Sequence, residues 1–247
     1  MRCWNYRHVV YYVQYSMATA YATFIRHLRE GRELSQAEVA KELHMSRPSY
    51  VALEKGTKEL TLSEAQAVVA FFSITIDELL SARVPNIPKY KQMLLAFLRE
   101  AEVSGKILKK TKLAKLLYLT DFSWYYAHKE SMSGMTYRKL DFGPVPDSYF
   151  ALLEEMEAKG ELNIKQIARE DYHMYEIEEA RASKKNALDL LSKEEQKHIK
   201  AVWKKWKDAD TKGIVHFTHN QLPYTKTNLN ENIPYELILK EDKAYIF

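Results

Sequence analysis

Few of the residues that usually carry catalysis stand together in this 247-residue sequence. His216 and His219 are three positions apart and can share a helical face, but no further His, Cys or carboxylate stands beside them at a recognisable metal-ligand spacing. Asp121 and Asp141 are separated by the central motif and could approach in space, but a lone carboxylate on an aromatic-rich helix more often pairs with a buried donor than catalyses. The sequence therefore predicts no catalytic residue, and binding is the better-supported class of function.

Cofactor and charge signals point the same way. Only 7 glycines are present and none form a glycine-rich run between a strand and a helix, so no phosphate loop, cofactor or metal is predicted. The net charge of +4 permits contact with nucleic acid without requiring it. A basic run precedes the central helix, and such runs are usually solvated surface, with phosphate or acid binding as the alternative. Its members are Lys106, Lys109, Lys110, Lys112 and Lys115.

The cellular compartment is predicted from the absence of disulfide-forming cysteine pairs, membrane-length apolar runs and a signal-peptide core. Cys3 is a single cysteine, which cannot form an intramolecular disulfide or a zinc framework and favours a reducing compartment. No apolar run approaches the ~20 residues of a membrane helix. Residues 9–13 are too short and tyrosine-rich for a signal-peptide core. We expect a cytoplasmic protein without membrane contact.

The chain is organised around the stretch from Thr111 to Pro146. Apolar residues recur there at helical spacing on nearly all sides, which predicts a helix buried in the middle of a domain, with Leu116, Leu117 and Trp124 in the core. A short strand over residues 137–142 and a rigid Gly-Pro-Val-Pro turn should follow. Pro146 is expected to begin the next helix, which should end before Gly160.

Three segments of this stretch carry a family resemblance. Lys112-Leu113-Ala114-Lys115-Leu116-Leu117-Tyr118-Leu119, Asp121-Phe122 and Phe142-Gly143-Pro144-Val145-Pro146 together resemble the Panacea, or SocA-like, domain over residues 88–247. The resemblance implies an antitoxin that neutralises a toxin protein by binding it, and one member of that family is a proteolysis adaptor. Thr218-His219 corresponds to a Ser-His pair of these domains, with threonine as the departure.

The resemblance identifies a domain rather than a contact surface. Tyrosine and arginine are good interface anchors, so those that flank the family motifs are candidates for the contact surface. The candidates for toxin binding are Lys115, Tyr118, Asp121, Tyr125 and Arg138. Gly143, Pro144 and Pro146 are expected to set the backbone shape. The aromatic N-terminal residues and the face from Lys200 to Lys207 are alternative contact surfaces.

Sharper local signals lie between residues 20 and 80. A first helix should end by Gly31, Ser35 and Glu38 form a capping box for a second, and Ser46 caps a third that Gly56 stops. Helices over residues 62–72 and 76–80 complete the set. Leu34-Ser35-Gln36-Ala37-Glu38-Val39-Ala40, Ser46-Arg47-Pro48-Ser49-Tyr50 and Leu53-Glu54-Lys55-Gly56 resemble the Cro and phage-repressor helix-turn-helix family. His44 stands where that family commonly has glycine.

That resemblance implies operator binding by the second and third helices. Gln36 should meet phosphate or a base edge, and Arg47 is the best direct reader because guanidinium can bond guanine O6 and N7 together. The full set of DNA-binding candidates is Gln36, Ser46, Arg47, Pro48, Ser49 and Val51. Paired half-sites predict a homodimer. The 7 basic against 9 acidic residues from Ala18 to Leu80 leave open that DNA binding has been lost.

The fold class predicted is mainly α with a smaller β component: a five-helix domain over residues 19–84, a linker over 85–88, and an α+β domain over 89–247. Residues 1–18 are an extension, either upstream of a true start at Met17 or an aromatic arm that packs on a partner. Alternation predicts a hairpin from residues 161–167 and 172–177. Ser192 and Glu195 should cap a helix with a tryptophan-rich inner face.

The leading hypothesis is an antitoxin that also represses its own operon. The alternatives are a mobile-element transcriptional regulator without a toxin, and an adaptor that delivers a client to a protease. A hydrolase or nuclease comes last.

Overall fold

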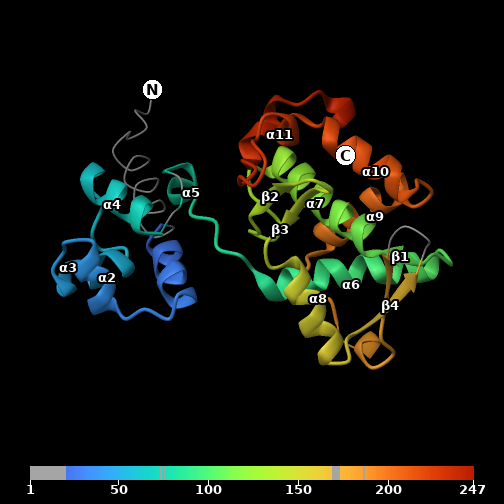
Figure 1. Ribbon diagram of the computed structural model, residues 1–247, viewed down its shortest axis with the longest axis horizontal. Coiled ribbons are helices and arrows are strands. Elements are labelled where there is room, and N and C mark those ends of the chain that lie inside the picture. The colour runs from blue at the N-terminus through green and yellow to red at the C-terminus, as the bar shows by residue number, and fades with distance from the viewer. Residues whose placement is uncertain (1–20, 73, 75, 169–172, 186) are drawn as a thin grey trace, which may run out of the picture. The chain divides into compact units, whose positions relative to one another are not determined.

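The computed structural model describes residues 21–72, 74, 76–168, 173–185 and 187–247, which form two compact units divided between Val84 and Pro85 (Figure 1). The predictions for residues 1–18 lie outside the described residues. The mainly α class with a smaller β component is confirmed. Among the described helices, none combines the length and apolarity needed to cross a membrane.

The first unit is built from short helices around its own core. Residues 21–31 are helical, followed by α2 (Gln36–Glu42), α3 (Arg47–Glu54), α4 (Leu62–Phe72) and α5 (Ile76–Ser81). The capping box of Ser35 and Glu38 is present, and the Ser46 side chain accepts from the Ser49 amide. These caps satisfy amides that a helix leaves unpaired at its start. Ile25, Val39, Tyr50, Leu53 and Val68 are fully buried and join the helices.

The second unit is arranged around the predicted central helix, which is α7 (Lys110–His128). Every side chain from Lys112 to Trp124 is buried, so the core prediction for Leu116, Leu117 and Trp124 is confirmed. Around α7 lie α6 (Ile87–Val103), α9 (Lys193–Trp206), α10 (Thr211–Asn220), β3 (Gly143–Pro146) and part of the C-terminal segment (Figure 1). The other helical bounds are α8 (Tyr149–Ala158), α11 (Leu222–Thr225), η1 (Ser183–Lys185), η2 (Tyr235–Lys240) and η3 (Lys243–Tyr245).

The larger sheet contains the predicted hairpin. β4 (Leu162–Ala168) pairs antiparallel with β5 (His173–Glu179), and β1 (Leu108–Lys109) adds to the other edge of β5, in the order β1-β5-β4. β1 was not predicted, because a two-residue strand inside a basic run shows no alternation. The capping box of Ser192 and Glu195 at α9 and the helix's buried tryptophan face are confirmed.

The smaller sheet corrects one prediction. β2 (Tyr137–Leu140) pairs antiparallel with β3 (Gly143–Pro146), so Pro146 ends a strand opposite Tyr137, and α8 begins at Tyr149. Residues two apart in a strand direct their backbone nitrogens to the same side. Pro144 and Pro146 therefore share one side, and an edge strand tolerates prolines whose missing N–H groups lie away from the ladder.

The predicted linker is shorter than expected. Ile87 and Pro88 are the first residues of α6, where proline is tolerated because the first amides of a helix have no partner inside it. The Asn86 side chain caps this helix by accepting from the Lys89 amide, at 3.0 Å. The backbone N–H of Asn86 in turn donates to the backbone carbonyl of Ser133 at 2.8 Å. The prolines therefore start a helix here rather than extend a linker.

Candidate functional site

The N-terminal end of α3 presents most of the predicted DNA-contacting side chains. Arg47 and Pro48 are exposed in the first turn, and Ser46 is exposed before it. Ser49 and Val51 are half-buried. Tyr50 and Leu53 of the same helix are fully buried and face the core. A helix start that carries exposed polar groups, backed by a packed face, is the geometry with which such motifs reach base edges.

Gln36 takes part in a network that the sequence did not reveal. Its amide nitrogen donates to Glu54 Oε2 at 2.8 Å, while Arg29 Nε donates to Glu54 Oε1 at 2.6 Å. Burial would raise the pKa of Glu54, but these hydrogen bonds and the Arg29 charge outweigh it and hold that pKa below its usual value. The network joins the first helix, α2 and α3, so it fixes the orientation of the motif.

The turn between α2 and α3 explains how the motif accommodates a histidine in place of glycine. His44 has φ of 53° and its amide donates to the Lys41 carbonyl, while the Met45 amide donates to the Ala40 carbonyl. This pair of bonds is the Schellman motif, whose left-handed position favours glycine. The His44 side chain is exposed, so the turn tolerates it at the expense of backbone strain.

In the second unit, Asp121 is a structural anchor inside the core. Its carboxylate is fully buried and accepts from the Ser133 amide at 2.8 Å, the Tyr137 hydroxyl at 2.8 Å, and the hydroxyls of Ser131 and Ser133. Burial raises the pKa of Asp121 in spite of these bonds. The carboxylate thus ties the residue 131–137 loop to α7, as expected for a lone buried acid.

Lys115 and His219 converge on Gly143. Lys115 is 2% exposed, and its Nζ donates to the Pro144 carbonyl at 2.9 Å. Gly143 has φ of 95°, and a Cβ placed on it would lie 2.7 Å from Lys115 Cε and 2.9 Å from His219 Nε2. Burial lowers the pKa of Lys115 to about 7. The glycine is required because two side chains from different helices occupy the space beside it.

An aromatic and cationic stack closes this cluster. The rings of His219 and Tyr224 are parallel with centroids 4.4 Å apart, and Lys139 Nζ lies 4.4 Å from the Tyr224 centroid. The pKa of His219 is lowered by burial and then by the charges of Lys115, Lys139 and His216. The half-buried His219 therefore packs between Tyr224 and the start of β3 at Gly143. Within the part of the chain that the structure describes, no three His, Cys, Asp or Glu side chains gather as a metal site.

Three of the five candidates for toxin contact are not on the surface. Tyr118 and Asp121 are fully buried and Lys115 nearly so, so the prediction that they form a contact surface is wrong. The physical reason is that α7 is surrounded by packed elements, so residues beside the family motif face the interior. The predicted basic run is not wholly solvated surface either. Lys112 and Lys115 are buried, and Lys112 donates to the Lys207 and Ala209 carbonyls.

The other two candidates are half-buried and already bonded. The Tyr125 hydroxyl donates to Glu236 at 3.1 Å. Arg138 Nε donates to Asp147 at 2.7 Å and its Nη1 donates to the Asn230 carbonyl at 2.6 Å. Both therefore stabilise the surface on which they lie. Their predicted role in toxin binding remains a prediction.

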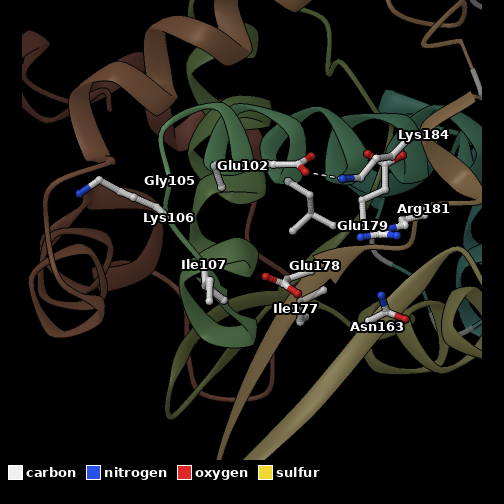
Figure 2. Close-up of a pocket in the computed structure, with 12 residues that line it drawn as sticks. Glu102, Gly105, Lys106, Ile107, Asn163, Ile177, Glu178, Glu179, Arg181 and Lys184 are labelled. Atoms are coloured by element: carbon white, nitrogen blue, oxygen red, sulfur yellow. Dashed lines mark hydrogen bonds and ion pairs between the residues drawn. The ribbon is translucent and has the colours of Figure 1, made fainter.

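A separate pocket lies between the end of α6 and the β4–β5 hairpin. Its volume is about 290 Å³, and Figure 2 shows acidic and basic side chains around it, with Lys184 paired to Glu102. Ile107 and Ile177 contribute apolar surface. Glu179 at its edge is held by Arg99. Since opposite charges neutralise one another around it, the pocket favours no one sign of ligand.

Comparison with known proteins assigns both parts of the chain. Residues 113–223 match the antitoxin SocA-like Panacea domain, and residues 25–79 match a helix-turn-helix family. The cryptic phage CTXphi transcriptional repressor RstR of Vibrio cholerae is 36% identical over 67 residues, covering 27% of this chain and 60% of the relative. The HTH-type transcriptional activator BcrR of Enterococcus faecalis is 37% identical over 57 residues, covering 23% and 28%.

The chain thus spans less than two thirds of the length of either relative. No solved structure matches it. The domain matches agree with the observed architecture, in which capped helices 2 and 3 form one unit and a buried α7 with a Gly-Pro hairpin forms the centre of the other. The chain therefore carries a helix-turn-helix domain followed by a SocA-like Panacea domain.

Proposed function

We propose that this protein is an antitoxin, in which the Panacea domain binds and blocks a toxin protein while the helix-turn-helix domain binds the operator of its own operon. The observation that carries the proposal is the joining of these two domains in one chain. The buried titratable groups support a binding role, since Asp121 and Lys115 are engaged in holding the core. The proposal places the protein in the cytoplasm with its operator.

The toxin-binding part is tested by co-expression with the protein encoded next to this chain's gene. We expect the neighbour alone to arrest growth, and co-expression of the full chain to restore it. Purified chain and a catalytically disabled neighbour should co-elute in size-exclusion chromatography. A neighbour that is harmless, or toxic in the presence of the full chain, would remove the neutralisation claim.

The DNA-binding part rests on the exposed start of α3. Replacing Arg47 by alanine should weaken operator binding by about 1–3 kcal/mol, because a guanidinium that bonds one base in two places contributes about that much. The measurement is a gel shift with the upstream region of the gene, at a stated salt concentration. Arg26→Ala is the matched control. Arg26 is an exposed arginine of the first helix, where it pairs with Glu30 of the same helix, and it lies outside α3.

Equal operator affinity of the Arg47 variant and the wild type would refute the reading role. No shift by the wild type would show that the acidic excess of the domain has abolished DNA binding. Half-sites about one helical turn apart call for two copies, so we expect a homodimer on DNA. Analytical ultracentrifugation of the protein with and without operator checks this expectation.

A second candidate is a mobile-element regulator without a toxin, which the similarity to a phage repressor favours. Operator binding combined with failure to rescue growth would select it. The adaptor alternative predicts faster turnover of a client when the protein is present, which a pulse-chase measurement would detect.

A further inference from the structure

The exposed face of α9 carries a row of lysines. Lys193, Lys197, Lys200 and Lys204 follow one another at steps of four, three and four residues, which places them on one side of the helix. All four are exposed, whereas the buried apolar side chains of α9 pack towards α6 and α7. We call these four residues the lysine row.

The segment that bears the lysine row carries the net charge of the protein. Residues 193–207 contain six lysines against two glutamates, so their formal charge of +4 equals that of the whole chain. Glu195 is buried and pairs with Lys89. Glu194 is exposed and lies 3.6 Å from His128 Nε2 at the end of α7. Positive charge therefore dominates this side of the helix.

Other carboxylates leave most of the lysine row free. Within the described part of the chain, Lys200 pairs with Glu100 at 3.6 Å, and the other three lysines form no ion pair. The Lys200 side chain is 64% exposed, so solvent screens this pair and Lys200 can exchange Glu100 for another anion. The acids just outside the two ends of α9 have partners away from the row, which are Gln92 for Asp189 and Lys106 for Asp208.

The spacing of the lysine row suits a phosphate backbone. Side chains at three- and four-residue steps lie about 5–6 Å apart, and at 1.5 Å per residue the row spans about 17 Å of the helix axis. Duplex DNA carries one negative charge per ~1.7 Å of its own axis. Every lysine of the row thus has phosphates within reach, and lysine is a flexible point charge that binds phosphate in many geometries.

The residue types on this face favour duplex DNA over a protein or a single strand. Protein interfaces are depleted in lysine and depend on aromatic and arginine anchors, and the exposed side of α9 offers neither. Single-stranded nucleic acid is bound through stacked aromatic side chains, but Trp203 and Trp206 are buried. The backbone of a duplex requires only positive charge, which the lysine row provides.

The helix-turn-helix domain is poor in the charge that DNA binding uses. Residues 18–80 hold 7 basic against 9 acidic residues, and one of the basic residues, Arg29, is already paired with Glu54. Proteins that bind DNA tightly commonly neutralise several phosphates. A protein held on its operator through Arg47 would keep the rest of its chain at a high effective concentration near the same DNA. Phosphate contacts that the first unit lacks can therefore come from the second.

We propose that the lysine row of α9 binds the phosphate backbone of double-stranded DNA and supplies a sequence-independent part of the affinity of this protein for its operator. The proposal rests on the proposed operator binding and extends it to the second unit. In this division of roles Arg47 reads bases, whereas the lysine row adds affinity on any sequence.

The test is fluorescence anisotropy of the full chain with a labelled duplex from the region upstream of its gene and with a scrambled duplex of equal length, at 50 to 200 mM salt. For Lys197→Gln/Lys204→Gln we expect the slope of log affinity against log salt to become shallower by about 2, since each lost phosphate contact removes about 0.9. Affinity should fall about tenfold or more, by the same factor on both duplexes. Arg47→Ala should instead weaken binding to the upstream duplex alone.

The matched control is Lys165→Gln/Lys226→Gln, which removes the same charge from exposed positions on β4 and after α11. It should keep the wild-type slope. Both double variants should melt at the wild-type temperature, because the four side chains are exposed and none forms an ion pair within the described residues. An equal loss of slope in the control would overturn the proposal, since net charge alone would then account for the effect.

The outcomes separate the lysine row from operator binding. If the wild type binds its operator and Lys197→Gln/Lys204→Gln keeps the full slope, the row is wrong and operator binding stands. If that variant keeps its DNA affinity but no longer rescues growth beside the neighbouring gene, the row contacts an acidic protein instead, which also overturns the proposal. If the wild type binds both duplexes equally and the variant loses slope, the row stands and operator recognition fails. Binding to neither duplex would remove both.

Discussion

Gly143 is the residue at which β3, α7 and α10 of the second unit come into contact. Lys115 from α7 and His219 from α10 both come within 3 Å of the place where a Cβ would stand. Its positive φ adds a second constraint, because side chains destabilise left-handed backbone. Neither constraint alone accounts for the site. Together they explain why the residue before Pro144 must be glycine in this fold.

Gly143→Ala should therefore destabilise the second unit by roughly 2–5 kcal/mol, adding backbone strain to overpacking. The measurement is chemical unfolding followed by circular dichroism. Gly160→Ala is the control, since Gly160 has φ of 70° but no atoms within 4 Å of a Cβ. It should lose about 1–2 kcal/mol from strain alone. Equal losses in both variants would show that Lys115 and His219 do not confine Gly143.

Lys115 gives the second unit a pH dependence of a definite sign. Burial lowers its pKa to about 7 in the folded chain, whereas an unfolded lysine has a pKa near 10.4. Between these values the unfolded chain binds a proton that the folded chain lacks, so the free energy of unfolding rises with pH. The penalty is greatest below pH 7, where it is on the order of 5 kcal/mol at 1.36 kcal/mol per pKa unit.

Lys115→Met should remove this slope. The measurement is the free energy of unfolding from pH 6 to 9 for the wild type and the variant, and their difference isolates Lys115 from other titrating groups. Methionine also leaves the Pro144 carbonyl without its donor, which shifts the free energy of unfolding by the same amount at every pH and does not alter the slope. Parallel pH profiles would contradict a buried lysine that titrates near neutrality.

At the scale of elements, the turn between α2 and α3 carries strain that can be relieved. His44→Gly should stabilise the helix-turn-helix domain by about 0.5–1 kcal/mol, because glycine avoids the left-handed strain but loses more chain entropy on folding. Thermal melting of the full chain measures it. His44→Ala keeps the strain and should leave stability nearly unchanged. A glycine variant no more stable than the alanine variant would rule out strain at His44.

Elements with strong local signals were predictable from sequence. The boxes at Ser35 and Ser192, the cap at Ser46, and the apolar periodicity of α7 each depend on residues three or four positions apart. The β4–β5 hairpin followed from alternation within each strand.

Elements that depend on distant partners were not predictable. Pro146 matched a helix start, and its place in β3 is set by pairing with β2. Lys115, Tyr118 and Asp121 resembled surface residues beside a motif, yet packing on every side of α7 buries them. The Arg29–Glu54 ion pair joins residues 25 positions apart, a separation that leaves no local pattern.

For the whole molecule, each unit has a hydrophobic core of its own, one around Ile25 and Leu53 and the other around α7. Substitutions in separate cores should act independently, since no buried residue is shared between the two. This independence lets Arg47→Ala test the proposed DNA binding in the full-length protein without a change in the core of the second unit.

The segment from Asn230 to Tyr235, which pairs with the outer edge of β2, is needed to finish folding the second unit and is synthesised late. The Ile233 amide bonds the Tyr137 carbonyl, and the Tyr235 hydroxyl bonds the Met135 carbonyl across 100 positions. Domains fold in order of emergence, and long-range pairing comes late. We expect the helix-turn-helix domain to be formed while the hairpin still waits for residue 235. Under the proposed antitoxin function, a nascent chain would acquire repression before protection.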